Sequence, residues 1–91
     1  MRVAQLRITG RVQAVGYRAW AIDEALRLGL RGWVRNRTDG SVEAFVTGAP
    51  EAVAAMVEAS RKGPTAAQVS DVTVTPDKDD GSVGFVARPT E

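Results

Sequence analysis

A nine-residue segment near the start of the chain, Gly10–Arg18, has residues suited to holding an anion. It follows a segment of strand-like alternation and precedes one of helix-like periodicity. A turn that enters a helix leaves backbone N–H groups unpaired at the positive end of the helix dipole, which suits a phosphate. Arg18 falls in the first helical turn, where the dipole disfavours a cation, and its planar guanidinium can hold two phosphate oxygens at once. The segment therefore predicts a phosphate site.

A second polar segment, Gly32–Glu43, contains Asn36 near the end of a strand-like run. Asn is disfavoured in strands and common at turns, so the start of a hairpin explains Asn36 almost as well as a functional role does. Its carboxamide both donates and accepts hydrogen bonds. Asn36 can therefore orient a water molecule, but it is not a base. Asp39 is expected to serve the turn itself.

Together the two segments closely resemble the acylphosphatase family, small metal-free hydrolases that cleave carboxyl-phosphate anhydrides. The first has the pattern Gly-x-Val-Gln-x-Val-x-Tyr-Arg over residues 10–18, and the second has Gly-Trp-Val-x-Asn-x-x-Asp-Gly-Ser-Val-Glu over residues 32–43. The resemblance extends from about Val3 to Phe85. Two motifs in register are far more specific than a lone glycine-rich turn.

The resemblance implies an enzyme that converts a small-molecule acyl phosphate to a carboxylate and inorganic phosphate, with phosphate also acting as an inhibitor. Arg18 matches the family's phosphate-gripping arginine, and Asn36 matches its water-positioning asparagine. The phosphate-binding N–H groups would belong to Gln13, Ala14, Val15, Gly16 and Tyr17. No metal and no cofactor is expected, and the substrate phosphate itself would accept the proton of the water. We expect a monomer.

Position 14 departs from the family, which usually has glycine where this chain has Ala14. Glycine is needed where φ is positive or where the backbone approaches a ligand closely. We expect Ala14 to be tolerated, with a negative φ, because the flanking residues fit the family pattern. Those residues are Gly10, Val12, Gln13, Val15 and Arg18.

The composition narrows the possible chemistry. The chain has 91 residues, which is enough for one domain over residues 1–91, and it has no cysteine and no histidine. A cysteine or histidine phosphoenzyme is therefore excluded, whereas an aspartate nucleophile stays open. The absence of cysteine suits a reducing compartment, and without a signal core or membrane-spanning stretch we expect a cytoplasmic protein. The acidic run at residues 77–81 lacks the ligand spacing of a calcium loop and reads as a hairpin turn.

Charge is divided unevenly along the chain. Residues 1–37 hold eight arginines and two acidic residues, whereas residues 38–91 hold four basic and nine acidic residues. For most of these arginines, a solvated surface is sufficient explanation. An electropositive face around the turn at residues 10–18 would attract anionic substrates. The acidic remainder disfavours a nucleic-acid surface, which needs a broad basic patch.

The periodicities predict an α+β fold. Alternation indicates strands at Val3–Thr9, around residues 69–74, and at Val83–Ala87, with a hairpin of Arg31–Arg37 and Ser41–Thr47. Apolar residues at helical spacing indicate helices at Arg18–Leu28 and from Pro50 to before Gly63. This order describes a ferredoxin-like split βαβ sandwich, with two helices on one face of a mainly antiparallel sheet. Tyr17, Trp20 and Trp33 are expected to be packing residues.

The fold alone does not determine the chemistry, so other functions stay open. One is a non-catalytic binding module, either a degenerate acylphosphatase-like domain or an ACT-like regulatory unit. Another is an RRM-type RNA binder, which stacks bases on exposed strand aromatics. Here only Trp33 and Phe45 could serve, and no segment resembles the RNP1 motif. The third is an excised domain that resembles the acylphosphatase-like start of maturation proteins that handle carbamoyl phosphate. We expect a free-standing enzyme instead.

Overall fold

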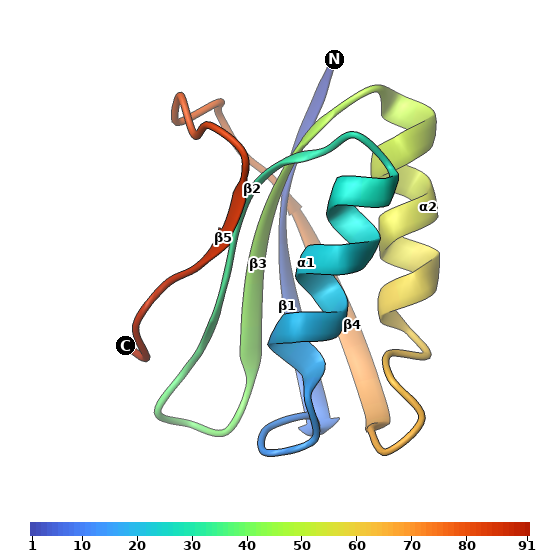
Figure 1. Cartoon of the computed structure of the whole chain (residues 1–91), viewed down its shortest axis with the longest axis vertical. Coiled ribbons are helices and arrows are strands. Elements are labelled where there is room, and N and C mark those ends of the chain that lie inside the picture. The colour runs from blue at the N-terminus through green and yellow to red at the C-terminus, as the bar shows by residue number, and fades with distance from the viewer.

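The structure is a computed structural model that describes all 91 residues, and it has the predicted order of strands and helices (Figure 1). Both helices lie on one face of a five-stranded sheet, so the predicted α+β sandwich is confirmed. The elements are β1 (Arg2–Arg11), α1 (Tyr17–Arg27), β2 (Arg31–Asn36), β3 (Val42–Gly48), α2 (Pro50–Ser60), β4 (Gln68–Pro76) and β5 (Phe85–Ala87).

The strand order in the sheet is β4-β1-β3-β2-β5. β1 pairs antiparallel with β3 and β4, and β2 pairs antiparallel with β3. Only the short β5 runs parallel to its neighbour, β2, with Val34 opposite Ala87. The sheet is therefore mainly antiparallel, as the sequence predicted. This arrangement places the end of β1, the start of α1 and the end of β2 at one end of the molecule.

The alternation of β1 directs its apolar residues toward the helices. Ala4, Leu6 and Ile8 are all buried, and they belong to one core cluster of 17 buried residues between the sheet and the helices. The two helices add most of the faces that their periodicity predicted, including Ala21 and Ala25 from α1, whereas Leu26 of the same apolar stripe is exposed. Burial of this apolar face provides the main stabilisation of the fold. Neither helix is long and apolar enough to cross a membrane.

The opposite face of the sheet carries a buried aromatic pair. The rings of Trp33 and Phe45 are stacked with centroids 5.8 Å apart, and the two residues are only 7% and 3% exposed. The guanidinium groups of Arg35 and Arg88 lie 4.8 and 4.7 Å from the Trp33 ring, and the indole N–H donates to Asp80 at 3.1 Å. This face therefore lacks the exposed rings with which an RRM binds bases.

The last strand is shorter than predicted. It begins at Phe85 rather than Val83, whose side chain is 88% exposed. Asp80 accepts hydrogen bonds from the backbone N–H and the hydroxyl of Ser82, which forms a local turn that competes with strand pairing. Gly84 has a φ of +69°, which also breaks the extended conformation before Phe85.

Tyr17, at the first position of α1, connects the two helices. Its buried hydroxyl donates a 2.7 Å hydrogen bond to the backbone carbonyl of Ser60, the last residue of α2. The ring fills the space where a Cβ on Gly63 would lie, 2.6 Å from the nearest ring carbon. Burial raises the pKa of Tyr17 to about 12. The expectation that Tyr17 is a packing residue agrees with this position.

We expect Tyr17→Phe to lower the free energy of unfolding by about 1 kcal/mol at neutral pH, because the Ser60 carbonyl loses its buried partner. The stability that the neutral phenol contributes is fully present below pH 10, the pKa of an unfolded tyrosine, and is lost as the pH rises toward about 12. The stability difference between wild type and Tyr17→Phe should therefore narrow over that range. Urea unfolding of both proteins at several pH values measures it. Because Tyr17 is the only tyrosine, phenolate absorbance reports its titration directly.

Candidate active site

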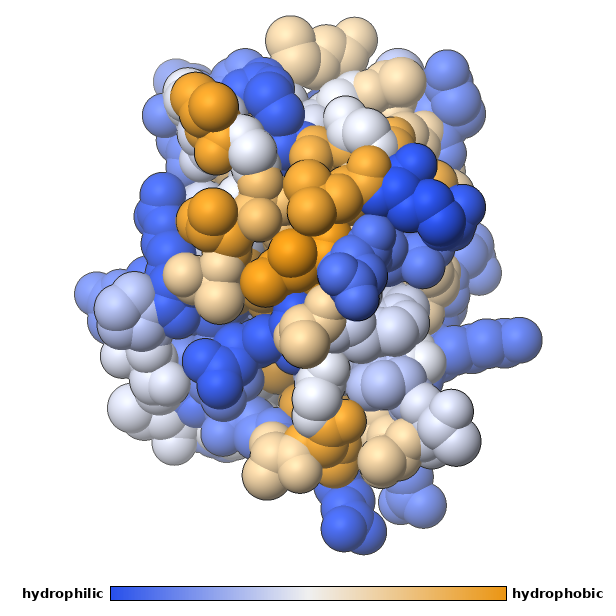
Figure 2. Space-filling view, in the orientation of Figure 1, coloured by the Kyte–Doolittle hydropathy of each residue, from blue (hydrophilic) through white to orange (hydrophobic).

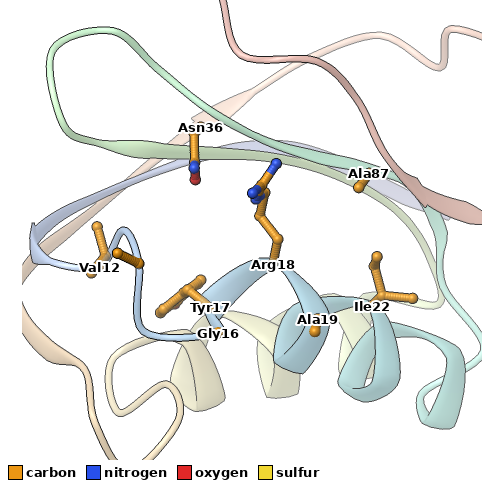
Figure 3. A pocket seen from close by; sticks show the side chains of 9 residues that line it. Val12, Gly16, Tyr17, Arg18, Ala19, Ile22, Asn36 and Ala87 are labelled. Atoms are coloured by element: carbon orange, nitrogen blue, oxygen red, sulfur yellow. The ribbon is translucent and has the colours of Figure 1, made fainter.

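An open pocket of about 420 Å³ lies between the start of α1 and the strands β2 and β5 (Figure 3). It contains both of the side chains to which the sequence assigned chemistry, Arg18 and Asn36. The close-up shows both side chains extending into the same space, one from the helix and one from the sheet. The pocket is lined by Val12, Ala14, Gly16, Tyr17, Arg18, Ala19, Ile22, Asn36 and Ala87.

Arg18 is the second residue of α1, and its side chain is exposed and forms no ion pair within the chain. The first turn of α1 contains no acidic residue that would offset its charge. A guanidinium therefore stands unneutralised at the positive end of a helix dipole, an arrangement that a bound anion would stabilise.

The segment between β1 and α1, residues 12–16, forms what we call the cradle loop. None of the backbone N–H groups of residues 13–18 donates a hydrogen bond within the chain. The φ angles are +59° at Ala14 and +81° at Gly16, whereas Gln13 before Ala14 and Val15 between the two do not have positive φ. Alternating φ signs turn successive N–H groups toward one side, which forms a concave backbone nest that suits an anion.

The expectation of a negative φ at Ala14 is wrong. Ala14 is the only non-glycine residue of the chain with a positive φ. The match of the neighbouring residues to the family does not determine φ at position 14, because this backbone angle is set by the shape of the loop. A left-handed alanine is strained by about 1–2 kcal/mol, because its Cβ approaches the following carbonyl. The chain therefore keeps the loop conformation that glycine would adopt without strain.

The side chain of Gln13 has a role that the sequence analysis did not assign. It was expected to contribute only its backbone N–H, but its amide nitrogen also donates to the carbonyls of Arg37 and Ser41, at 2.7 and 2.9 Å. These two carbonyls belong to the hairpin that follows Asn36. The hydrogen bonds therefore fix the cradle loop against the strand that carries Asn36. Local sequence patterns do not indicate that the Gln13 side chain contacts a hairpin 24 residues further along the chain.

Asn36 is the last residue of β2, where it pairs with Val42, and it is half-buried. Its own carbonyl accepts a hydrogen bond from the N–H of Glu91. The turn follows Asn36, where the N–H of Gly40 donates to the carbonyl of Arg37 at 3.1 Å. Within it, the Asp39 carboxylate accepts from the N–H and hydroxyl of Ser41 at 2.9 and 2.6 Å. These bonds, with smaller effects from nearby arginines, lower the pKa of Asp39. Turn formation thus explains Asp39, as expected, but it does not explain Asn36.

The uneven division of charge along the sequence is largely cancelled in space. Arginines from the first part of the chain pair with carboxylates from the second on the sheet face opposite the helices. At its centre the buried Glu43 carboxylate accepts from Arg35 at 2.7 Å and lies beside Arg37 and Gln5. The other pairs are Arg7 with Asp39, Arg31 with Asp79, and Arg35 with Glu91. Arg18 lies outside this network.

The fold and the pocket together describe a small α+β protein whose pocket has the chemical groups that a compact, multiply charged anion requires. An unpaired guanidinium and a ring of unpaired N–H groups can hold a tetrahedral oxyanion, and a carboxamide opposite them can hold a water. No His, Cys, Asp or Glu lines the pocket. No group of three or more such residues anywhere in the structure is arranged to hold a metal ion.

The chain belongs to the acylphosphatase family, whose model matches residues 4–87. An acylphosphatase from Rhodospirillum rubrum is 48% identical over 90 residues, which is 99% of each chain. The crystal structure of acylphosphatase from Bacillus subtilis is similar with a TM-score of 0.92 and 36% identity, over 97% of this chain and 99% of that one. The prediction that this protein is an enzyme of this family is therefore confirmed, and members of the family hydrolyse acyl phosphates.

The chain also has the fold of one part of a much longer protein. A crystal structure of full-length HypF is similar with a TM-score of 0.90 and 22% identity, over 98% of this chain but only 12% of that protein. At this identity the similarity shows the fold alone. The R. rubrum relative, by contrast, aligns over nearly its entire length.

We expect Ala14→Gly to raise the free energy of unfolding by about 0.5–1 kcal/mol. Relief of left-handed strain contributes about 1–2 kcal/mol, and the greater freedom of glycine in the unfolded chain offsets about half of it. Ala54→Gly is the matched control, because Ala54 is exposed in the middle of α2 and should lose about 0.5–1 kcal/mol. Denaturant unfolding of both variants measures the difference. Equal destabilisation in the two variants would contradict the left-handed assignment.

Proposed function

We propose that this enzyme hydrolyses acyl phosphates without a metal ion, with Arg18 and the N–H groups of residues 13–17 holding the phosphoryl group and Asn36 orienting the water. The observation that carries the proposal is the meeting of three elements in one pocket. They are a guanidinium without an ion pair, a loop of unpaired N–H groups and a carboxamide from the facing strand. Separately, each has an ordinary structural explanation, but together they complement a phosphoryl group and an attacking water.

In the proposed reaction, the oxygen of the water bonds to phosphorus as the bond from phosphorus to the acyl oxygen breaks. The bonding electron pair leaves with the acyl oxygen, which becomes the carboxylate. One water proton passes to a phosphoryl oxygen, so that the products are a carboxylate and dihydrogen phosphate. A carboxylate is a good leaving group, so catalysis depends on holding charge on the three equatorial oxygens and on aligning the water.

The composition of the pocket supports proton transfer to the substrate itself. The lining residues include no carboxylate and no other strong base, and the amide of Asn36 cannot accept a proton at neutral pH. An aspartate nucleophile, which the sequence left open, has no candidate among the lining residues. Direct attack by water is therefore the mechanism that these residues favour.

We expect Arg18→Ala and Asn36→Ala each to reduce kcat by about 10²–10³, the usual cost of one oriented group in a transition state. Their effects on ligand binding should differ. Arg18→Ala removes charge that holds the phosphoryl group, so it should also raise KM and weaken competitive inhibition by inorganic phosphate. Asn36→Ala should leave phosphate inhibition close to that of wild type. Steady-state kinetics with benzoyl phosphate, with and without phosphate, separate the two variants.

Two controls make this comparison specific. Arg18→Lys should restore little activity, because a point charge does not replace a guanidinium that binds two oxygens. Arg61→Ala should have nearly wild-type kinetics, since Arg61 is exposed just after α2, where it pairs only with Glu58. Near-normal kcat in Asn36→Ala would make Asn36 a merely structural strand residue and would overturn its proposed role.

We expect full activity after exhaustive treatment with a chelator such as EDTA. The charge that a metal would supply comes in our proposal from Arg18 and the loop N–H groups, and the pocket offers no carboxylate, imidazole or thiolate ligand. The rate of acyl phosphate hydrolysis before and after chelation, and after addition of Mg²⁺, measures this. A rate that disappears on chelation and returns with Mg²⁺ would refute the metal-free mechanism.

A further inference from the structure

We propose that the pocket contains an apolar subsite, formed by Ala19, Ile22 and Ala87, that binds the acyl group of the substrate and selects for apolar acyl groups. The proposal rests on the proposed function, because it assumes that the phosphoryl group is held beside Arg18. All three residues line the same pocket as Arg18 and Asn36. They contribute only methyl and aliphatic surface, whereas the polar contacts of the pocket come from the other residues.

The topology separates the apolar part of the pocket from Asn36. The chain leaves α1 and turns directly into β2, so the two elements run in opposite directions. Ile22 is one helical turn beyond Arg18, which moves it toward the start of β2. Ala87 pairs with Val34, two residues before Asn36, and so is displaced in the same direction. Figure 3 accordingly shows the guanidinium of Arg18 between Asn36 on one side and Ile22 and Ala87 on the other.

The geometry of phosphoryl transfer then determines which group lies in this part of the pocket. Attacking and leaving oxygens lie roughly in line, on opposite sides of phosphorus. If Asn36 holds the water, the leaving acyl oxygen faces away from Asn36. The remainder of the substrate must therefore extend toward Ile22 and Ala87, which is the apolar end of the pocket.

The surface next to the apolar end of the pocket is also apolar. Leu26 follows Ile22 by one turn on α1, and its side chain is 55% exposed. The space-filling view shows hydrophobic side chains gathered over α1 in the middle of this face (Figure 2). An exposed leucine next to an apolar pocket gives a longer or branched acyl group further surface to cover.

This lining should favour apolar acyl groups over small or charged ones. Each methylene that an acyl group buries there should improve kcat/KM by up to about fourfold. A second carboxylate on the acyl group would find no cation and no hydrogen-bond donor among Ala19, Ile22 and Ala87. We therefore expect the order benzoyl phosphate, then acetyl phosphate, then succinyl phosphate.

The decisive experiment places a cation in the subsite. It measures kcat/KM for succinyl phosphate and for acetyl phosphate and compares their ratio between variants. In Ala87→Lys, the ratio for succinyl phosphate over acetyl phosphate should rise at least fivefold, because the new ammonium can pair with the distal carboxylate. Ala87 is exposed, so the variant is compatible with folding. Any general attraction of lysine for the phosphoryl group is common to both substrates and cancels in the ratio.

Val86→Lys is the matched control. Val86 precedes Ala87 in the same strand and is 51% exposed, but it pairs with Trp33 and so faces the opposite side of the sheet. In Val86→Lys, the ratio of kcat/KM for succinyl phosphate over acetyl phosphate should equal that of wild type. Ile22→Ala is the complementary test, and it should reduce the preference for benzoyl over acetyl phosphate several-fold.

The outcomes distinguish the subsite from the reaction. Equal succinyl-to-acetyl ratios in wild type, Ala87→Lys and Val86→Lys would overturn the subsite while leaving acyl phosphate hydrolysis intact. An equal rise in both lysine variants would also overturn it, because the effect would then be one of overall charge. A wild-type enzyme that hydrolyses none of the three substrates would refute the proposed function, and the subsite with it.

Discussion

Two hydrogen bonds from the side chain of Gln13 are the constraint on which the candidate site depends. The cradle loop and the strand end that carries Asn36 belong to separate segments, and the backbone pairing of the sheet does not join them. Gln13 reaches across to the carbonyls of Arg37 and Ser41, just beyond Asn36. Each bond contributes only about 1 kcal/mol to stability, but together they fix the spacing between the proposed anion site and the proposed water site. In-line attack requires that spacing, since small misplacements of reacting groups cost orders of magnitude in rate.

The rest of the charge distribution explains why Arg18 is available for a ligand. The first part of the chain is rich in arginine and the second part in acidic residues, and the sheet brings them together on the face without helices. There Arg35 pairs with the buried Glu43, and the guanidinium groups of Arg35 and Arg88 cover the Trp33 ring. Such groups stabilise structure and are not free to bind an anion. Arg18 emerges on the other face, from a helix without nearby carboxylates in its first turn, and so keeps its charge for a ligand.

The sequence was a good guide wherever local periodicity determines structure, and a poorer one where distant contacts do. Alternation in β1 and the apolar stripe of α1 predicted both elements, because burial of one face dictates those patterns. The start of β5 was misplaced, because the turn made by Asp80 and Ser82 outweighs the apparent alternation. Arg18 and Asn36 were found from their motifs, and the structure brings both into one pocket. The side-chain role of Gln13 was missed, because a contact across 24 residues leaves no local signal.

The backbone strain at Ala14 is explained by the way the cradle loop is anchored at its two ends. A left-handed alanine would relax toward negative φ unless the surrounding structure prevented it, and here Gln13 on one side and the start of α1 on the other fix the ends of the loop. If position 14 did relax, its N–H would rotate away from those that follow, and the concave arrangement would be lost. The loop therefore maintains, at the expense of local stability, the conformation to which our proposal assigns anion binding. Ala14 disfavours a positive φ, and yet its φ is positive. The shape of the loop is therefore determined by the anchors at its two ends rather than by the residue at position 14.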